Sequence, residues 1–107
     1  MTKIKLNEVQ HIEKYGSIDG YFNLEYYDDD NDKCYLTSLY VSEDKRKQGI
    51  GTQLVKLAEE IADSKCYSQI LLKCNRTEWV YGWYKSMGYN HFQDSDFNDV
   101  WLIKNLR

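Results

Sequence analysis

The spacing of hydrophobic and polar residues changes along the chain, and this spacing distinguishes the predicted strands from the predicted helices. Aromatic and branched apolar residues crowd the stretches 18–27 and 34–41, which is typical of strands. Between residues 50 and 64 the apolar side chains recur every three or four positions, as on one face of a helix. We predict a second helix that begins around residues 75–78, with Thr77 as its N-cap, and ends at Gly88.

Shorter segments complete the predicted sheet. Residues 9–14 form either a strand or a loop, and Gly16-Ser17 marks a turn. The acidic stretches 28–32 and 94–99 are predicted to be turns that join neighbouring strands. The remaining predicted strands are residues 3–6, 68–74, 89–93 and 100–104.

The order of these elements predicts the fold class. Antiparallel strands come first, and residues 34–74 then form a strand–helix–strand crossover whose two strands run parallel. We expect an α+β domain of the three-layer α/β type, with a mixed, mostly antiparallel central sheet and two main helices. Residues 1–107 are expected to form one domain. Ligands of such sheets bind at the carboxyl ends of the strands.

Composition narrows the classes of function. A formal net charge of −3 argues against nonspecific nucleic-acid binding, and no apolar run is long enough to span a membrane. The amino terminus does not lead into the apolar core of a secretory signal. The three cysteines show no zinc or disulfide spacing, so we expect reduced thiols and a cytoplasmic location.

No metal is expected in this chain. The acidic stretch 28–32 lacks the alternate spacing, the central glycine and the terminal glutamate of a calcium loop. His11 and His91 are isolated in the sequence and are interpreted as ordinary surface or strand residues. Cys74 is interpreted as a buried thiol rather than a nucleophile.

The stretch from Arg46 to Thr52 carries the clearest chemical signal. It follows a predicted strand and opens the first helix without a capping side chain, and Gly49 and Gly51 stand there instead. A helix start exposes unpaired N–H groups and a partial positive charge, which suits a phosphate. The dinucleotide fingerprint fails because Leu54 occupies the place of its third glycine, and the Gly-Lys-Ser/Thr ending of a nucleotide triphosphatase loop is absent.

The pattern that remains, Arg-x-x-Gly-x-Gly between a strand and a helix, resembles the acetyl-coenzyme A (acetyl-CoA) pyrophosphate loop of the GCN5-related N-acetyltransferase (GNAT) family. Tyr84-x-x-x-Gly88-Tyr89 is similar to the second signature of that family. Without the first signature, Tyr84 and its neighbours would be interpreted as core residues. The resemblance implies the GNAT fold, with the parallel strands splayed open beyond Val41 and Cys74.

The resemblance also implies a co-substrate, acetyl-CoA, and a role for each matching residue. The hydroxyl of Tyr84 would protonate the thiolate leaving group, and the amides of residues 47–52 would hold the pyrophosphate. The backbone of residues 39–41 would pair with the pantetheine arm. The implied coenzyme-binding residues are Leu39, Tyr40, Val41, Arg46, Lys47, Gln48, Gly49, Ile50, Gly51, Thr52, Asn75 and Tyr84.

Two departures from the family pattern concern the acceptor. The short stretch between Leu6 and Ile18 leaves no room for the two helices that usually form part of the acceptor pocket, so we expect a shortened N-terminal part. Many members carry a Glu as general base on the strand before the loop, and residues 35–41 contain none. Glu25, Glu43 or a water molecule could serve as the general base instead. Alternatively, the amine arrives already neutral and needs no base.

The leading hypothesis is an N-acetyltransferase in which an amine attacks acetyl-CoA directly. A protein lysine or amino terminus suits an open acceptor face better than a small molecule does. The alternative is a non-enzymatic module that binds an acyl-CoA or a protein through the same fold. A nucleic-acid-binding α+β domain is a third hypothesis, which the net charge disfavours. Among partners, the sequence leaves a homodimer open.

Overall fold

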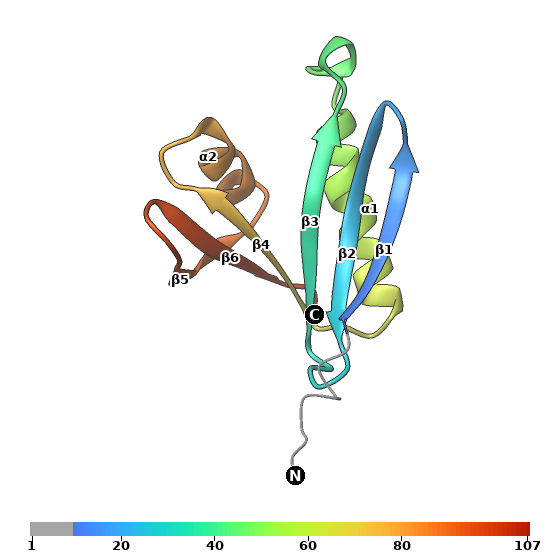
Figure 1. The fold of residues 1–107 in the computed structure, drawn as a ribbon, viewed down its shortest axis with the longest axis vertical. Coiled ribbons are helices and arrows are strands. Elements are labelled where there is room, and N and C mark those ends of the chain that lie inside the picture. Colours follow the sequence, from blue (N-terminus) through green and yellow to red (C-terminus); the bar gives the residue numbers. More distant parts are fainter. Residues whose placement is uncertain (1–9) are drawn as a thin grey trace.

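The computed structural model describes residues 10–107, and the predicted strand 3–6 lies outside this range. The described chain forms a mixed six-stranded sheet in the order β1-β2-β3-β4-β6-β5 (Figure 1). The elements are β1 (Gln10–Ser17), β2 (Gly20–Tyr27), β3 (Lys33–Val41), η2 (Glu43–Lys45), α1 (Ile50–Ser64), β4 (Gln69–Asn75), α2 (Trp79–Ser86), β5 (Asn90–Asp94) and β6 (Asp99–Asn105). The predicted fold class is confirmed, including the parallel pairing of β3 with β4.

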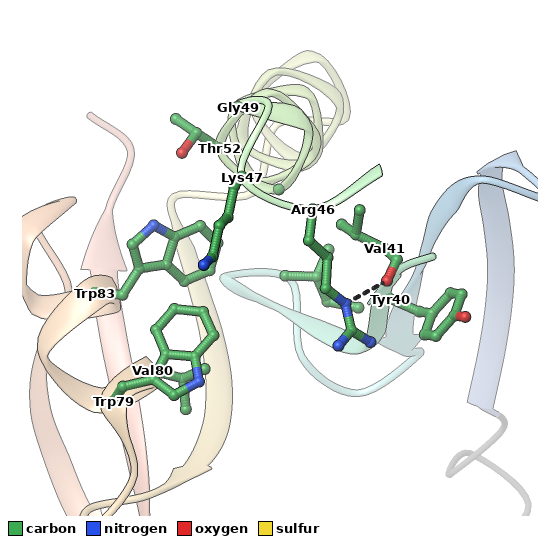
Figure 2. A pocket seen from close by; sticks show the side chains of 11 residues that line it. Tyr40, Val41, Arg46, Lys47, Gly49, Thr52, Trp79, Val80 and Trp83 are labelled. Carbon is green, nitrogen blue, oxygen red and sulfur yellow. Dashed lines mark hydrogen bonds between the residues drawn. The ribbon is translucent and has the colours of Figure 1, made fainter. Parts of the chain in front are cut away.

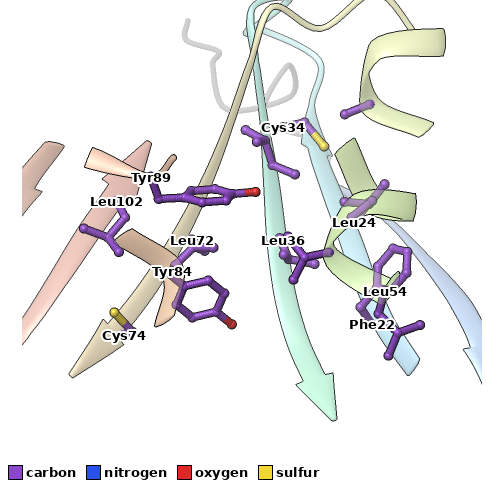
Figure 3. Packing of buried hydrophobic residues seen from close by; sticks show 14 of the residues in the cluster. Phe22, Leu24, Cys34, Leu36, Leu54, Leu72, Cys74, Tyr84, Tyr89 and Leu102 are labelled. Carbon is purple, nitrogen blue, oxygen red and sulfur yellow. The ribbon is translucent and has the colours of Figure 1, made fainter. Parts of the chain in front are cut away.

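One core lies between the sheet and the two helices. Alternate residues of β2, β3, β4 and β6 point into it, because successive side chains of a strand face opposite sides of the sheet. The helix α1 contributes Val55 and Ala58, which are completely buried, and Tyr84 and Tyr89 come from α2 and the turn after it. Figure 3 shows Tyr84 and Tyr89 beside strand residues of this core. Labelled strand residues of this core are Phe22, Leu24, Cys34, Leu36, Leu72, Cys74 and Leu102.

The parallel strands β3 and β4 stay paired over a short stretch only. Their last partners are Tyr35 and Leu71, after which the strands diverge (Figure 1). The predicted opening beyond Val41 and Cys74 is therefore corrected, since the separation begins at Tyr35. The reason is a bulge in β3, where Ser38 has a φ of 55° and the register with β2 shifts. An extra residue bends the strand that contains it.

One predicted turn also needs correction. Gly16 and Ser17 pair with Tyr21 and Gly20 inside the β1–β2 hairpin, so the turn lies two residues later, at residues 18–19. The stretch 9–14, left open between strand and loop, belongs to β1 from Gln10 onward. The acidic stretch 28–32 is the predicted turn between β2 and β3.

The start of α2 differs from the prediction as well. Its N-cap is Glu78, which makes no side-chain capping bond, and Thr77 is not a cap. Asn75 Oδ1 instead accepts hydrogen bonds from the Thr77 amide at 2.8 Å and the Thr77 hydroxyl at 2.6 Å. Asn75 thereby forms a local turn that competes with capping. Gly88 follows α2 with a φ of 100°, as predicted for a residue after a helix.

An ion pair links the two helices to the far half of the sheet. Lys104 on β6 donates to Glu59 of α1 at 3.1 Å and to the Met87 carbonyl at the end of α2 at 2.9 Å. The hydroxyl of Tyr89 donates to the other carboxylate oxygen of Glu59 at 2.9 Å. These contacts connect α1 to β6 and to the end of α2, so they link the two halves of the sheet that lie on either side of the opening between β3 and β4. No helix within residues 10–107 is long and apolar enough to cross a membrane.

Candidate functional site

A cavity of about 660 Å³ lies at the end of the sheet where β3 and β4 diverge. Three elements build its walls: the end of β3, the loop that leads into α1, and the exposed side of α2 (Figure 2). The lining residues are Leu39, Tyr40, Val41, Arg46, Lys47, Gly49, Gly51, Thr52, Trp79, Val80 and Trp83.

The loop before α1 and the first turn of the helix line this cavity through Lys47, Gly49, Gly51 and Thr52. Lys47 and Gly49 both have positive φ angles, 64° and 81°, which turn the chain sharply before the helix. The first backbone N–H of the helix with an acceptor in the preceding turn is that of Gln53, which donates to the Gly49 carbonyl at 3.1 Å. Within the described chain, the amides of residues 47–52 have no acceptor. They form a row of donors at the positive end of the helix dipole.

Arg46 fixes this loop to the end of β3. Its Nε donates to the Val41 carbonyl at 2.9 Å (Figure 2). The first turn of α1 contains no acidic residue, so no side chain there neutralises the positive end of the helix. The loop therefore combines cations, free amides and a helix start, which is the chemistry that binds a phosphate.

Gly51 permits the close approach of the two helices across the cavity. A Cβ atom built on Gly51 would lie 3.3 Å from Cη2 of Trp83, so a larger residue would have to displace the indole. Gly49 has a different role, because a Cβ there would meet no atom within 4 Å. Its positive φ is what favours glycine at that position.

Tyr84 is buried in the opening between the two parallel strands. The side chain is 8% exposed, and Figure 3 shows its hydroxyl pointing toward the wider end of the opening. Burial raises the pKa of Tyr84 to about 12, and the nearby Cys74 adds to this shift. No described residue accepts a hydrogen bond from the hydroxyl. Tyr84 is therefore a protonated phenol at neutral pH, with its proton uncommitted.

The structure brings together most of the residues predicted to bind the coenzyme. Four of the predicted residues do not line the cavity: Gln48, Ile50, Asn75 and Tyr84. Gln48 bonds to the Asp44 carbonyl at 3.3 Å, and Ile50 packs against the core. Asn75 is used in the turn before α2.

Three lining residues were not predicted, namely Trp79, Val80 and Trp83. Their spacing places them on one face of α2, which is the signal that the sequence contains. The same spacing is also typical of residues that face the core. Only the packing of α2 shows that these side chains line the cavity.

The two carboxylates considered as bases lie in different surroundings. Glu25 accepts a hydrogen bond from the Thr37 hydroxyl at 2.7 Å, on the strand that borders the opening. Glu43 is exposed in η2.

Burial raises the pKa of the Cys74 thiol, and Asp99 and Glu78 add to the effect. No group of three or more potential metal ligands occurs among residues 10–107.

The predicted family can now be tested against known proteins. The family model for the acetyltransferase (GNAT) domain matches residues 8–91. The chain belongs to the GNAT acetyltransferase family. No curated protein sequence gives a significant match.

Solved structures of GNAT and related proteins have the same fold. A GNAT acetyltransferase from Elizabethkingia anophelis, with acetyl-CoA bound, is 20% identical with a TM-score of 0.71, over 83% of this chain and 69% of that one. The PaiA N-acetyltransferase from Thermoplasma acidophilum, in complex with coenzyme A, is 26% identical with a TM-score of 0.68, over 80% and 52%. A protein from Klebsiella pneumoniae described as an acyl-CoA N-acyltransferase is 17% identical with a TM-score of 0.72, over 82% and 63%. The chain thus spans between about half and two thirds of the length of these relatives.

Proposed function

We propose that this chain is an N-acetyltransferase that transfers the acetyl group of acetyl-CoA to an amine. The observation that carries the proposal is the row of unpaired amides at residues 47–52, in a loop that partly lines a cavity beside the opening between β3 and β4. Family membership and the coenzymes bound to two structural relatives support the same conclusion.

The residues of the cavity fit coenzyme A part by part. The amides of residues 47–52 would bind the pyrophosphate, with Arg46 holding the loop in place. Among residues 10–107, the edge of β3 that faces β4 has no strand partner after Tyr35, so the backbone of residues 39–41 is available to the amide groups of the pantetheine arm. Gly49 leaves open space where a side chain would block the approach of a phosphate.

The proposed chemistry needs an acid and an attacking amine. Acetyl-CoA, when bound, supplies the acetyl group as a thioester. The amine nitrogen forms a bond to the carbonyl carbon while the carbon–sulfur bond breaks. Tyr84 holds a proton on its phenol oxygen and donates it to the departing sulfur. The nitrogen, positively charged after its attack, loses one proton, which returns through solvent to the Tyr84 phenolate.

The acceptor is proposed to be a lysine side chain or amino terminus of a protein. The amine must lose a proton before it attacks, and Glu25 is the better placed of the two carboxylates. Its partner Thr37 lies on β3 within the stretch that has separated from β4, whereas Glu43 lies in the exposed turn before the loop. The reaction would proceed with the carboxylate, or water held by it, as the base.

Calorimetry with acetyl-CoA, followed by acetyl transfer to amines, lysine peptides and proteins of a cell lysate, tests the proposal. The wild-type chain is expected to bind and to transfer label, while Gly49→Glu should lose binding because it places a carboxylate beside the pyrophosphate. Gly82→Glu is the matched control, since Gly82 is exposed on α2 and a Cβ there meets no atom within 4 Å. Lack of binding would overturn the proposal, and binding without transfer to any amine would favour the non-enzymatic module.

A further inference from the structure

Trp79 is a large apolar side chain that the packing of α2 leaves uncovered. It is 75% exposed, although it lines the cavity. Its contact is with the neighbouring indole of Trp83, at 5.8 Å between ring centroids and 55° between planes. Trp83 in turn packs against the core. An exposed aromatic surface beside a cavity is typical of a ligand-binding wall.

The chemistry of the cavity wall changes from aliphatic to aromatic. Leu39 and Val80 form an aliphatic part that packs against the core. Trp83 and Trp79 form the aromatic part, which ends at the exposed indole of Trp79. Figure 2 shows the Lys47 side chain extending from the phosphate loop toward the two indoles. A cation, free amides and two neighbouring, tilted aromatic rings thus surround the same space.

This arrangement matches the chemistry of a nucleotide joined to an aliphatic arm. Given the proposed function, we propose that the exposed indole of Trp79, supported by Trp83, stacks against the adenine ring of coenzyme A. Adenine is the aromatic group of that molecule, and aromatic side chains bind bases through their faces. The aliphatic wall then serves the pantetheine arm, and Lys47 adds a positive charge for the phosphates of the nucleotide.

A truncated ligand separates this contact from binding of the arm. We would measure by calorimetry the affinities of coenzyme A and of 4′-phosphopantetheine, which lacks the adenosine part. Trp79→Leu should lower the affinity for coenzyme A by about 5- to 100-fold, which is the range that the loss of one base–aromatic stack produces. The affinity for 4′-phosphopantetheine should stay within about twofold. Trp79→Phe keeps an aromatic face and should recover part of the loss.

Trp101 provides a matched control on another part of the molecule. It lies on β6, 5.7 Å from the ring of Tyr35, and does not line the cavity. Trp101→Phe should therefore bind both ligands as the wild type does. Coenzyme A should also quench the tryptophan fluorescence of Trp101→Phe, and this quenching should fall sharply in a Trp79→Leu, Trp101→Phe double variant. Thermal unfolding checks that the exposed position leaves each fold intact.

The outcomes distinguish this inference from the proposed function. If Trp79→Leu loses affinity for coenzyme A but not for 4′-phosphopantetheine, stacking on adenine is supported. Equal affinity of wild type and Trp79→Leu for coenzyme A overturns the inference and leaves the proposed function standing. An equal loss for both ligands also overturns it, because the indole would then contact the arm. Absence of coenzyme A binding to the wild type overturns the proposed function and the inference together.

Discussion

Gly51 of α1 lies directly against the indole of Trp83 on α2. A Cβ on Gly51 would come within 3.3 Å of Cη2 and 3.4 Å of Cζ2 of that ring. The two helices lie on opposite sides of the opening between β3 and β4, and both residues line the cavity, so this contact brings its two walls together beside the loop. The glycine that leaves the helix start open for an anion also lets the aromatic wall approach it.

Enlarging Gly51 should therefore affect both stability and coenzyme binding. In Gly51→Val the new methyl groups would overlap the indole, and we expect a loss of about 1–3 kcal/mol in the free energy of unfolding. Displacement of Trp83 should lower the affinity for coenzyme A as well. Gly82→Val is the control, because it makes the same change inside a helix where a Cβ meets nothing within 4 Å. Urea unfolding and calorimetry measure both effects, and equal behaviour of the two variants would contradict the argument.

Tyr84→Phe removes the proposed proton donor with little change in shape. We expect turnover to fall by about 100-fold or more, as for the loss of a general acid. Coenzyme affinity should change little, since Tyr84 does not line the cavity. Steady-state kinetics and calorimetry separate the two quantities.

Another tyrosine of α2 controls for the substitution itself. Tyr81 is partly buried and lies under the Lys85 ammonium at 5.3 Å, outside the cavity lining. Tyr81→Phe should keep wild-type turnover. Full turnover in Tyr84→Phe would exclude the role as proton donor.

Much of the site was predictable because its signals are local. The bounds of α1 were predicted as they occur, since its apolar positions repeat over a long helix. The candidate phosphate loop was predicted because glycines and cations stand at a helix start, a feature that neighbouring residues determine; its binding of phosphate stays a prediction. The prediction of Thr77 as N-cap was wrong because its hydroxyl donates to Asn75, a local competition that the sequence does not rank.

The parts that were missed depend on contacts between distant segments. The opening begins at Tyr35 because a bulge near Ser38 arises from the pairing of β3 with β2. The aromatic wall depends on which face of α2 meets the sheet, and helical spacing shows only that Trp79 and Trp83 share a face. Such information comes from tertiary packing rather than from the pattern along the chain.

The buried Tyr84 predicts the response of stability to alkaline pH. Its pKa is raised by burial from 10.0 to about 12, so the folded state favours the protonated phenol. This contribution is complete below pH 10.0 and is lost as the pH rises toward about 12, because the unfolded state releases its proton first. Urea unfolding at a series of pH values should show falling stability above pH 10.0, with a shallower fall in Tyr84→Phe. An unchanged slope in the variant would contradict the assignment.

The ion pair between Glu59 and Lys104 should couple the two helices. Removing either partner leaves the other partly buried, with its remaining bonds to Tyr89 or Met87. We expect Lys104→Met to lower the free energy of unfolding by about 1–3 kcal/mol. A double-mutant cycle with Glu59→Gln should give a coupling energy of about 0.5 kcal/mol or more, because the residues are in contact. The exposed pair of Arg76 and Asp94, at 3.1 Å, is the control, and its cycle should give a smaller value. Equal coupling in the two cycles would show that the Glu59–Lys104 pair contributes no more than a surface contact.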